Sequence, residues 1–77
     1  MKKVKVDLNL DYYEKDNSVG WRINENDFTK EELSESWADI CTEVYNHIRE
    51  KLHLKKGTYI DVDADKDANG WRWARVY

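Results

Sequence analysis

A hydrophobic stripe with helical spacing runs through the middle of the sequence. Its members are Leu33, Trp37, Ile40, Cys41, Val44, Ile48 and Leu52. Just before it, Thr29 and Glu32 have the spacing of a capping box, in which each side chain accepts a hydrogen bond from the backbone N–H of the other residue. A stripe of this kind is normally buried against another element. The sequence therefore predicts one long helix at about residues 30–54, with Gly57 as its stop.

Alternating apolar and polar residues on both sides of this helix predict four strands. The first two are joined at Asp16-Asn17, where a two-residue turn would place Leu10 opposite Ile23. The last two follow the helix and are joined by a second short turn. The expected strands cover about residues 3–13, 19–24, 58–64 and 71–77.

The order of these elements, β-β-α-β-β, predicts the α+β class. We expect a four-stranded, mainly antiparallel sheet with the long helix packed on one face. At 77 residues the chain has room for a single domain, residues 1–77. The expected core consists of Val4, Val6, Leu8, Leu10, Trp21, Ile23, Leu33, Trp37, Ile40, Val44, Ile48, Ile60 and Val62. The second face of the sheet is then open to a partner or to a second copy of the chain.

The composition argues against several classes of function. A formal net charge of −3 and an isoelectric point near 5.3 argue against direct binding to nucleic acid, which depends on Lys and Arg. Cys41 is the single cysteine, so neither an intramolecular disulfide nor a cysteine-based zinc site is expected. The basic start of the chain is not followed by an apolar run, and no segment has the length and apolarity of a membrane span. We therefore expect a cytoplasmic protein.

The sequence offers no set of residues for catalysis or for a cofactor. It lacks a Ser-His-Asp set, a Gly-rich phosphate loop and an HExxH motif. Asp65, Asp67, Asn69 and Gly70 match the first positions of a calcium-binding EF-hand loop, but Val76 stands where the bidentate Glu belongs. A polar turn is the simpler interpretation. We predict no catalytic, cofactor-binding or metal-binding residues, and we do not expect an enzyme.

Two rows of carboxylates are the strongest indication of a binding surface. The first row, on the exposed side of the helix, includes Glu35, Asp39 and Glu43, and the second, on the third strand, includes Asp61, Asp63 and Asp65. Carboxylates on a rigid scaffold can imitate a phosphate backbone and occupy a basic groove on another protein. The alternative is the ordinary charged surface of a small protein.

The direction of Trp71 and Trp73 decides whether they belong to such a surface. A two-residue turn at Asn69-Gly70, which is a strong hairpin signal, points both side chains toward the core. A three-residue loop shifts the register by one residue and exchanges the two faces of the strand. Ala74 and Val76 then lie in the core, and both tryptophans lie outside beside the acidic strand. We predict the inward arrangement, and we count both tryptophans with the carboxylates as candidate partner-binding residues.

Residues 4–52 resemble the N-terminal part of HicB-type antitoxins. The shared features are a first strand, an acidic turn at Glu14-Lys15-Asp16-Asn17, a return strand and a helix rich in Glu, although the family's third strand has no room before Thr29. In size, acidity and lack of catalytic residues the chain is also similar in type to phage-encoded inhibitors such as anti-CRISPR proteins. The sequence thus predicts a non-catalytic acidic inhibitor that docks on a basic surface of a nucleic-acid-handling protein. The alternatives are a homodimerising regulatory subunit and a HicB-like antitoxin.

Overall fold

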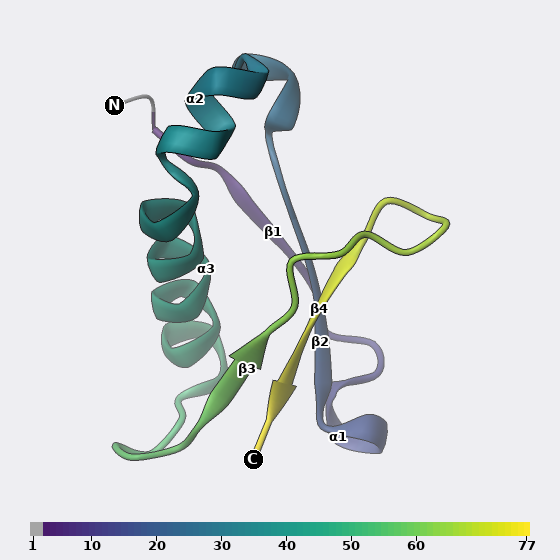
Figure 1. The fold of residues 1–77 in the computed structure, drawn as a ribbon. Helices are drawn as coiled ribbons and strands as arrows, with labels where there is room; N and C mark the ends of the chain where they lie inside the picture. The colour runs from purple at the N-terminus through teal and green to yellow at the C-terminus, as the bar shows by residue number, and fades with distance from the viewer. Residues whose placement is uncertain (1–2) are drawn as a thin grey trace.

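The computed structural model describes residues 3–77 and has the predicted α+β fold (Figure 1). Its strands are β1 (Val6–Asn9), β2 (Ser18–Ile23), β3 (Ile60–Val62) and β4 (Arg72–Val76). Its helices are α1 (Tyr13–Asp16), α2 (Lys30–Glu35) and α3 (Trp37–Leu52), with a 3₁₀ turn, η1, at Glu25–Asp27. The sheet has the order β1-β2-β4-β3, its neighbouring strands are antiparallel, and α3 runs along one of its faces.

The capping box forms as predicted and starts α2. The Thr29 Oγ1 accepts a hydrogen bond from the Glu32 N–H at 3.1 Å, and the Glu32 carboxylate accepts one from the Thr29 N–H at 2.9 Å. The predicted helix is not continuous, because Ser36 leaves the helical conformation with φ −100° and ψ 6°. Serine is a weaker helix former than alanine or leucine, which makes such an interruption less costly. α2 and α3 therefore follow one another as two helices.

α3 ends earlier than the sequence predicted. His53 takes the left-handed conformation directly after Leu52 and caps the helix. Gly57 lies in the turn that follows, at φ 92°, so the prediction that Gly57 ends the helix is wrong. Arg49 fixes this turn by donating hydrogen bonds to the carbonyls of Lys55 and Thr58.

The first strand is shorter than predicted and its pairing differs. The chain leaves the sheet after Asn9 and forms α1 in place of the two-residue turn. Val6 therefore lies opposite Ile23, where Leu10 was predicted. The predicted pairing is wrong because the local hydrogen bonds of α1 replace the last rungs of the expected ladder.

A loop at residues 63–71, and not a two-residue hairpin, joins β3 to β4. Ala74 and Val76 lie opposite residues of β3 with their side chains in the core. Because side chains alternate along a strand, Trp71 and Trp73 lie on the other face of the sheet. The prediction that both tryptophans face the core is wrong, and the outward arrangement describes β4 correctly.

The core lies between α3 and the sheet. Its buried apolar members are Val19, Trp21, Ile23, Ile40, Val44, Ile48, Ile60, Ala74 and Val76. The other predicted core residues, Val4, Val6, Leu8, Leu10, Leu33, Trp37 and Val62, are partly buried and pack against these. Val19, Ala74 and Val76 were not predicted. The buried charge of Arg72 was not predicted either, and it belongs to the network described below.

Candidate functional site

The face of the sheet opposite α3 carries aromatic and charged side chains. We call it the open face. Its members are Asp7, Asn9, Ser18, Gly20, Arg22, Tyr59, Asp61, Asp63, Trp71, Trp73, Arg75 and Tyr77. Figure 1 shows that α3 covers only the other side of the sheet. The side chains that alternate away from α3 therefore lie on one face across the four strands.

Trp73 lies at the centre of the open face and is held from three sides. It rests over Gly20, where a β-carbon would stand only 3.3 Å from two atoms of the indole ring. Its Nε1 donates a hydrogen bond to the Asp67 Oδ2 at 2.9 Å. The ring of Tyr12 lies with its centre 6.3 Å from that of Trp73. Trp73 is thus a half-buried aromatic side chain that is held in a defined orientation.

Asp67 organises the loop that precedes Trp73. One carboxylate oxygen accepts hydrogen bonds from the N–H groups of Asn69 at 2.9 Å and Trp71 at 3.0 Å. The hydrogen bond from Trp73, followed by the backbone hydrogen bonds, lowers the pKa of the Asp67 carboxyl below its ordinary value. In the EF-hand pattern this carboxylate would face a calcium ion, but here both of its oxygens face N–H donors.

Trp71 lies on the same face and is partly covered. The guanidinium carbon of Arg22 stands 4.5 Å from the centre of the Trp71 ring, in cation–π geometry. Arg22 also forms an exposed ion pair with Asp7 at 3.3 Å. At the other end of the face, the exposed rings of Tyr59 and Tyr77 contact each other with centres 5.6 Å apart.

Two shallow hollows flank Trp73. One is lined by Ser18, Asp61, Asp63, Trp73, Ala74 and Arg75. The other is lined by Tyr12, Asp16, Ser18, Trp73 and Arg75. The tryptophan is therefore bordered by carboxylates on both sides, with one arginine between them, which is the mixture of an aromatic anchor and a polar rim typical of protein-binding surfaces.

The predicted site residues divide between two sides of the molecule. Asp61, Asp63, Trp71 and Trp73 lie together on the open face, and Asp65 follows in the loop. The candidates on the helices are Glu35, Asp39 and Glu43, which lie in the other layer of the fold. All three are exposed, because it is the inward side of α3 that is buried in the core. One flat partner surface cannot contact both rows. The carboxylates of the helices and those of β3 therefore do not form a single docking surface.

The roles of two residues that shape the open face were not predicted. Gly20 is needed because Trp73 crosses the strand at that position, and a glycine inside a predicted strand is the signal that could have indicated it. Asp67 precedes the Asn-Gly turn, and aspartate is frequent in turns because its side chain accepts nearby backbone hydrogen bonds.

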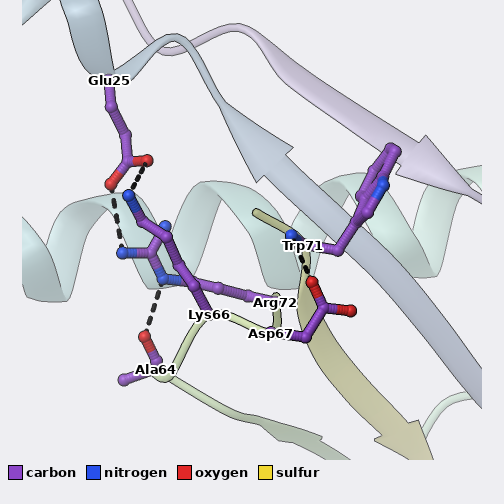
Figure 2. A network of polar contacts seen from close by, with 6 residues as sticks. All are labelled: Glu25, Ala64, Lys66, Asp67, Trp71 and Arg72. Atoms are coloured by element: carbon purple, nitrogen blue, oxygen red, sulfur yellow. Dashed lines mark hydrogen bonds and ion pairs between the residues drawn. The ribbon is translucent and has the colours of Figure 1, made fainter. Parts of the chain in front are cut away.

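A second polar cluster lies at the edge of the core, and Figure 2 shows its contacts. Arg72 donates hydrogen bonds to the Ala64 carbonyl at 2.7 Å and to Glu25 at 3.1 Å, and Lys66 contacts Glu25 at 2.7 Å. Burial alone would raise the pKa of Glu25, but the hydrogen bonds and charges of both cations outweigh it and lower the pKa. The cluster ties the 63–71 loop to η1, which is a structural role.

Cys41 lies on α3 and is half-buried. Burial raises the pKa of its thiol, which the nearby charge of Arg72 opposes only in part. The reactive form of a cysteine is the thiolate, so this environment disfavours a nucleophilic role.

No protein-family model, curated protein or solved structure matches this chain. The likeness to HicB-type antitoxins is therefore a resemblance in the order of elements. Within residues 3–77 the helices are too short and too polar to cross a membrane. In the same part of the chain, His, Cys, Asp and Glu side chains do not gather in a group of three or more that could hold a metal ion.

Proposed function

We propose that this protein is a non-catalytic protein-binding domain that docks through the open face. The observation that supports this proposal is the fixed position of Trp73 between two hollows. Ordering a flexible aromatic side chain on binding costs free energy, and a side chain that is already held avoids most of that cost. Tryptophan is also among the residues that most often dominate the energy of protein interfaces.

The charge around Trp73 favours a basic partner. Asp61 and Asp63 line one hollow and Asp16 lines the other, against the single Arg75 in both. The whole chain carries a formal net charge of −3. Complementary charge steers association and selects among partners. A basic groove on a nucleic-acid-handling protein fits this surface, and blocking that groove makes the domain an inhibitor of the phage anti-defence or anti-CRISPR type, acting in the cytoplasm.

Two pairs of substitutions test which side docks. Asp61→Asn with Asp63→Asn removes two carboxylates from the open face, and Asp39→Asn with Glu43→Gln removes two from the helix layer. Both pairs change the net charge equally. Wild type and both variants are immobilised, and captured proteins from the source cell are quantified at low and high salt, with and without duplex DNA as competitor.

We expect the open-face pair to weaken capture of a DNA-binding protein by about tenfold, because each lost rim charge contributes up to about 1 kcal/mol. The helix pair should have little effect, and both DNA and high salt should release the partner. Equal losses in both pairs, or a loss only in the helix pair, would contradict docking through the open face.

A second candidate function is homodimerisation through the same face. The exposed pair Tyr59 and Tyr77 favours it, because exposed large apolar side chains near a sheet edge are common at interfaces between copies. Light scattering over a range of concentrations tests this candidate. A mass that remains that of one chain at the highest concentration excludes it.

A further inference from the structure

The carboxylate of Asp67 uses its two oxygens for two different purposes. One oxygen accepts the backbone N–H groups of Asn69 and Trp71 and so shapes the loop. The other accepts the indole N–H of Trp73. We propose that Asp67 is a positioning residue of the open face, which holds the Trp73 indole in the orientation that a partner meets. Only the effect on partner binding depends on the proposed function; the effect on Trp73 does not.

The other two contacts of the indole are packing contacts, with Gly20 and with Tyr12. Gly20 supports the ring from below, and Tyr12 lies beside it in a tilted geometry. Neither contact satisfies the Nε1–H donor. A hydrogen bond to an ionised carboxylate is shorter and stronger than one between neutral groups, and it is directional. Asp67 therefore selects one rotamer of Trp73 among those that the surface of the sheet would allow.

The neighbouring carboxylates do not share this role. Asp63 accepts the N–H of Asp65 at 3.0 Å, which is a local turn contact. Asp65 is exposed, two residues before Asp67 in the same loop. Asp65→Asn is thus a matched control for Asp67→Asn, with the same change of charge and nearly the same place in the chain.

Asp67→Asn separates the two purposes of the carboxylate. An asparagine has one oxygen acceptor and one NH₂ donor in place of two oxygens. Its oxygen can still accept the N–H groups of Asn69 and Trp71, so the loop can keep its shape. Its NH₂ group then faces the Nε1–H of Trp73, donor against donor, and the indole loses its partner.

The first test follows the indole N–H signals of the ¹⁵N-labelled protein by NMR, with Trp73→Phe to identify the signal of Trp73. We expect the Trp73 indole proton to exchange with solvent about tenfold faster in Asp67→Asn, the factor expected for a lost charge-assisted hydrogen bond. Asp65→Asn should leave it unchanged. Equal exchange in the two asparagine variants would overturn the proposal, whatever happens to partner binding.

The second test is a double-mutant cycle on the partner identified by capture. Asp67→Asn should weaken binding when Trp73 is present and should have no further effect in the Trp73→Phe background, because phenylalanine has no N–H to position. An equal effect in both backgrounds would mean that Asp67 acts on the loop alone, and would overturn the proposal. If exchange responds as expected but binding ignores both residues, docking through the open face fails while the positioning role stands.

Discussion

The ion pair of Arg72 and Glu25 predicts that its two single substitutions have unequal effects on stability. The side chain of Arg72 is 10% exposed, whereas that of Glu25 is 25% exposed and has a second partner, Lys66. Removing a partner from a buried charge leaves that charge without compensation, which is more costly than removing the charge itself. We therefore expect Glu25→Ala to destabilise the fold more than Arg72→Met.

The magnitudes follow from what each substitution leaves behind. Glu25→Ala leaves a buried guanidinium that still donates to the Ala64 carbonyl but has lost its carboxylate partner. We expect the free energy of unfolding to fall by about 2–3 kcal/mol. This is below the range for a fully buried ion pair, because water reaches Glu25. Arg72→Met removes the charge and fills the space beside Trp21 and Trp37 with an apolar side chain. Glu25 keeps Lys66, so we expect a loss of only about 0–1.5 kcal/mol.

Urea denaturation followed by far-ultraviolet circular dichroism measures both losses. With a slope of about 1 kcal/mol per molar urea for so small a domain, Glu25→Ala should lower the midpoint by about 2–3 M and Arg72→Met by less than about 1.5 M. The double variant should be more stable than Glu25→Ala alone, since it removes the buried charge of Arg72 together with its partner. If Arg72→Met proves the more damaging single change, the buried charge is not the dominant cost and the reasoning fails.

Four further outcomes can be measured on the isolated domain. Thr29→Ala should lower the free energy of unfolding by about 1 kcal/mol through loss of the capping box, and Thr29→Ser should restore most of it in the same urea experiment. Trp37→Ala should cost about 3 kcal/mol, because the ring packs on the core with its centre 6.2 Å from that of Trp21; an unchanged thermal midpoint would contradict this packing. Trp71→Ala with Trp73→Ala should leave the circular dichroism spectrum intact, since both side chains lie outside the core, and unfolding would contradict that placement. Folding lowers the pKa of the Asp67 carboxyl, so its ionised form stabilises the fold. This stabilisation is fully present above the unfolded pKa of about 3.8 and is lost as the pH falls through the lower folded pKa. The free energy of unfolding should therefore depend less steeply on pH in this acid range in Asp67→Asn than in the wild type.

The helical part of the fold could be predicted because its signals are local. The capping box and the apolar stripe lie within one segment, and Ile40, Val44 and Ile48 of that stripe are fully buried as expected. The interruption at Ser36 was missed because a single serine is compatible with both a helix and a break. Leu33 before the break and Trp37 after it both pack against the core.

The strand pairings could not be predicted as reliably, because each depends on the length of a connection. The alternation that begins at Val4 is real, but the last residues of the predicted strand form α1 instead. A turn at Asp16-Asn17 and a helix ended by Asn17 in the left-handed conformation use the same residue types. Sequence alone did not distinguish them. As a result, the observed pairing of β1 with β2 differs from the predicted one by four residues.

The outward direction of Trp71 and Trp73 was missed for a different reason, since the two-residue turn favoured at Asn69-Gly70 places both side chains in the core. At the start of β4 the reverse occurs, because Arg72 has a charged partner 47 positions away in Glu25 and two tryptophan rings beside it. Such a long-range partner leaves no local signal. Once Arg72 faces the core, alternation along the strand places Trp71 and Trp73 on the other side.

The position of the aromatic surface therefore depends on the 63–71 loop as much as on the strands. A shift of β4 by one residue would exchange its two faces, burying the tryptophans and exposing Ala74 and Val76. Asp67 stabilises the observed loop, since its carboxylate accepts hydrogen bonds from the N–H groups of Asn69 and Trp71. The same carboxylate then holds Trp73 by its indole N–H. One side chain thus contacts both the loop that precedes β4 and the indole of Trp73, so the position of the aromatic surface follows from this loop and not from the hairpin signal alone.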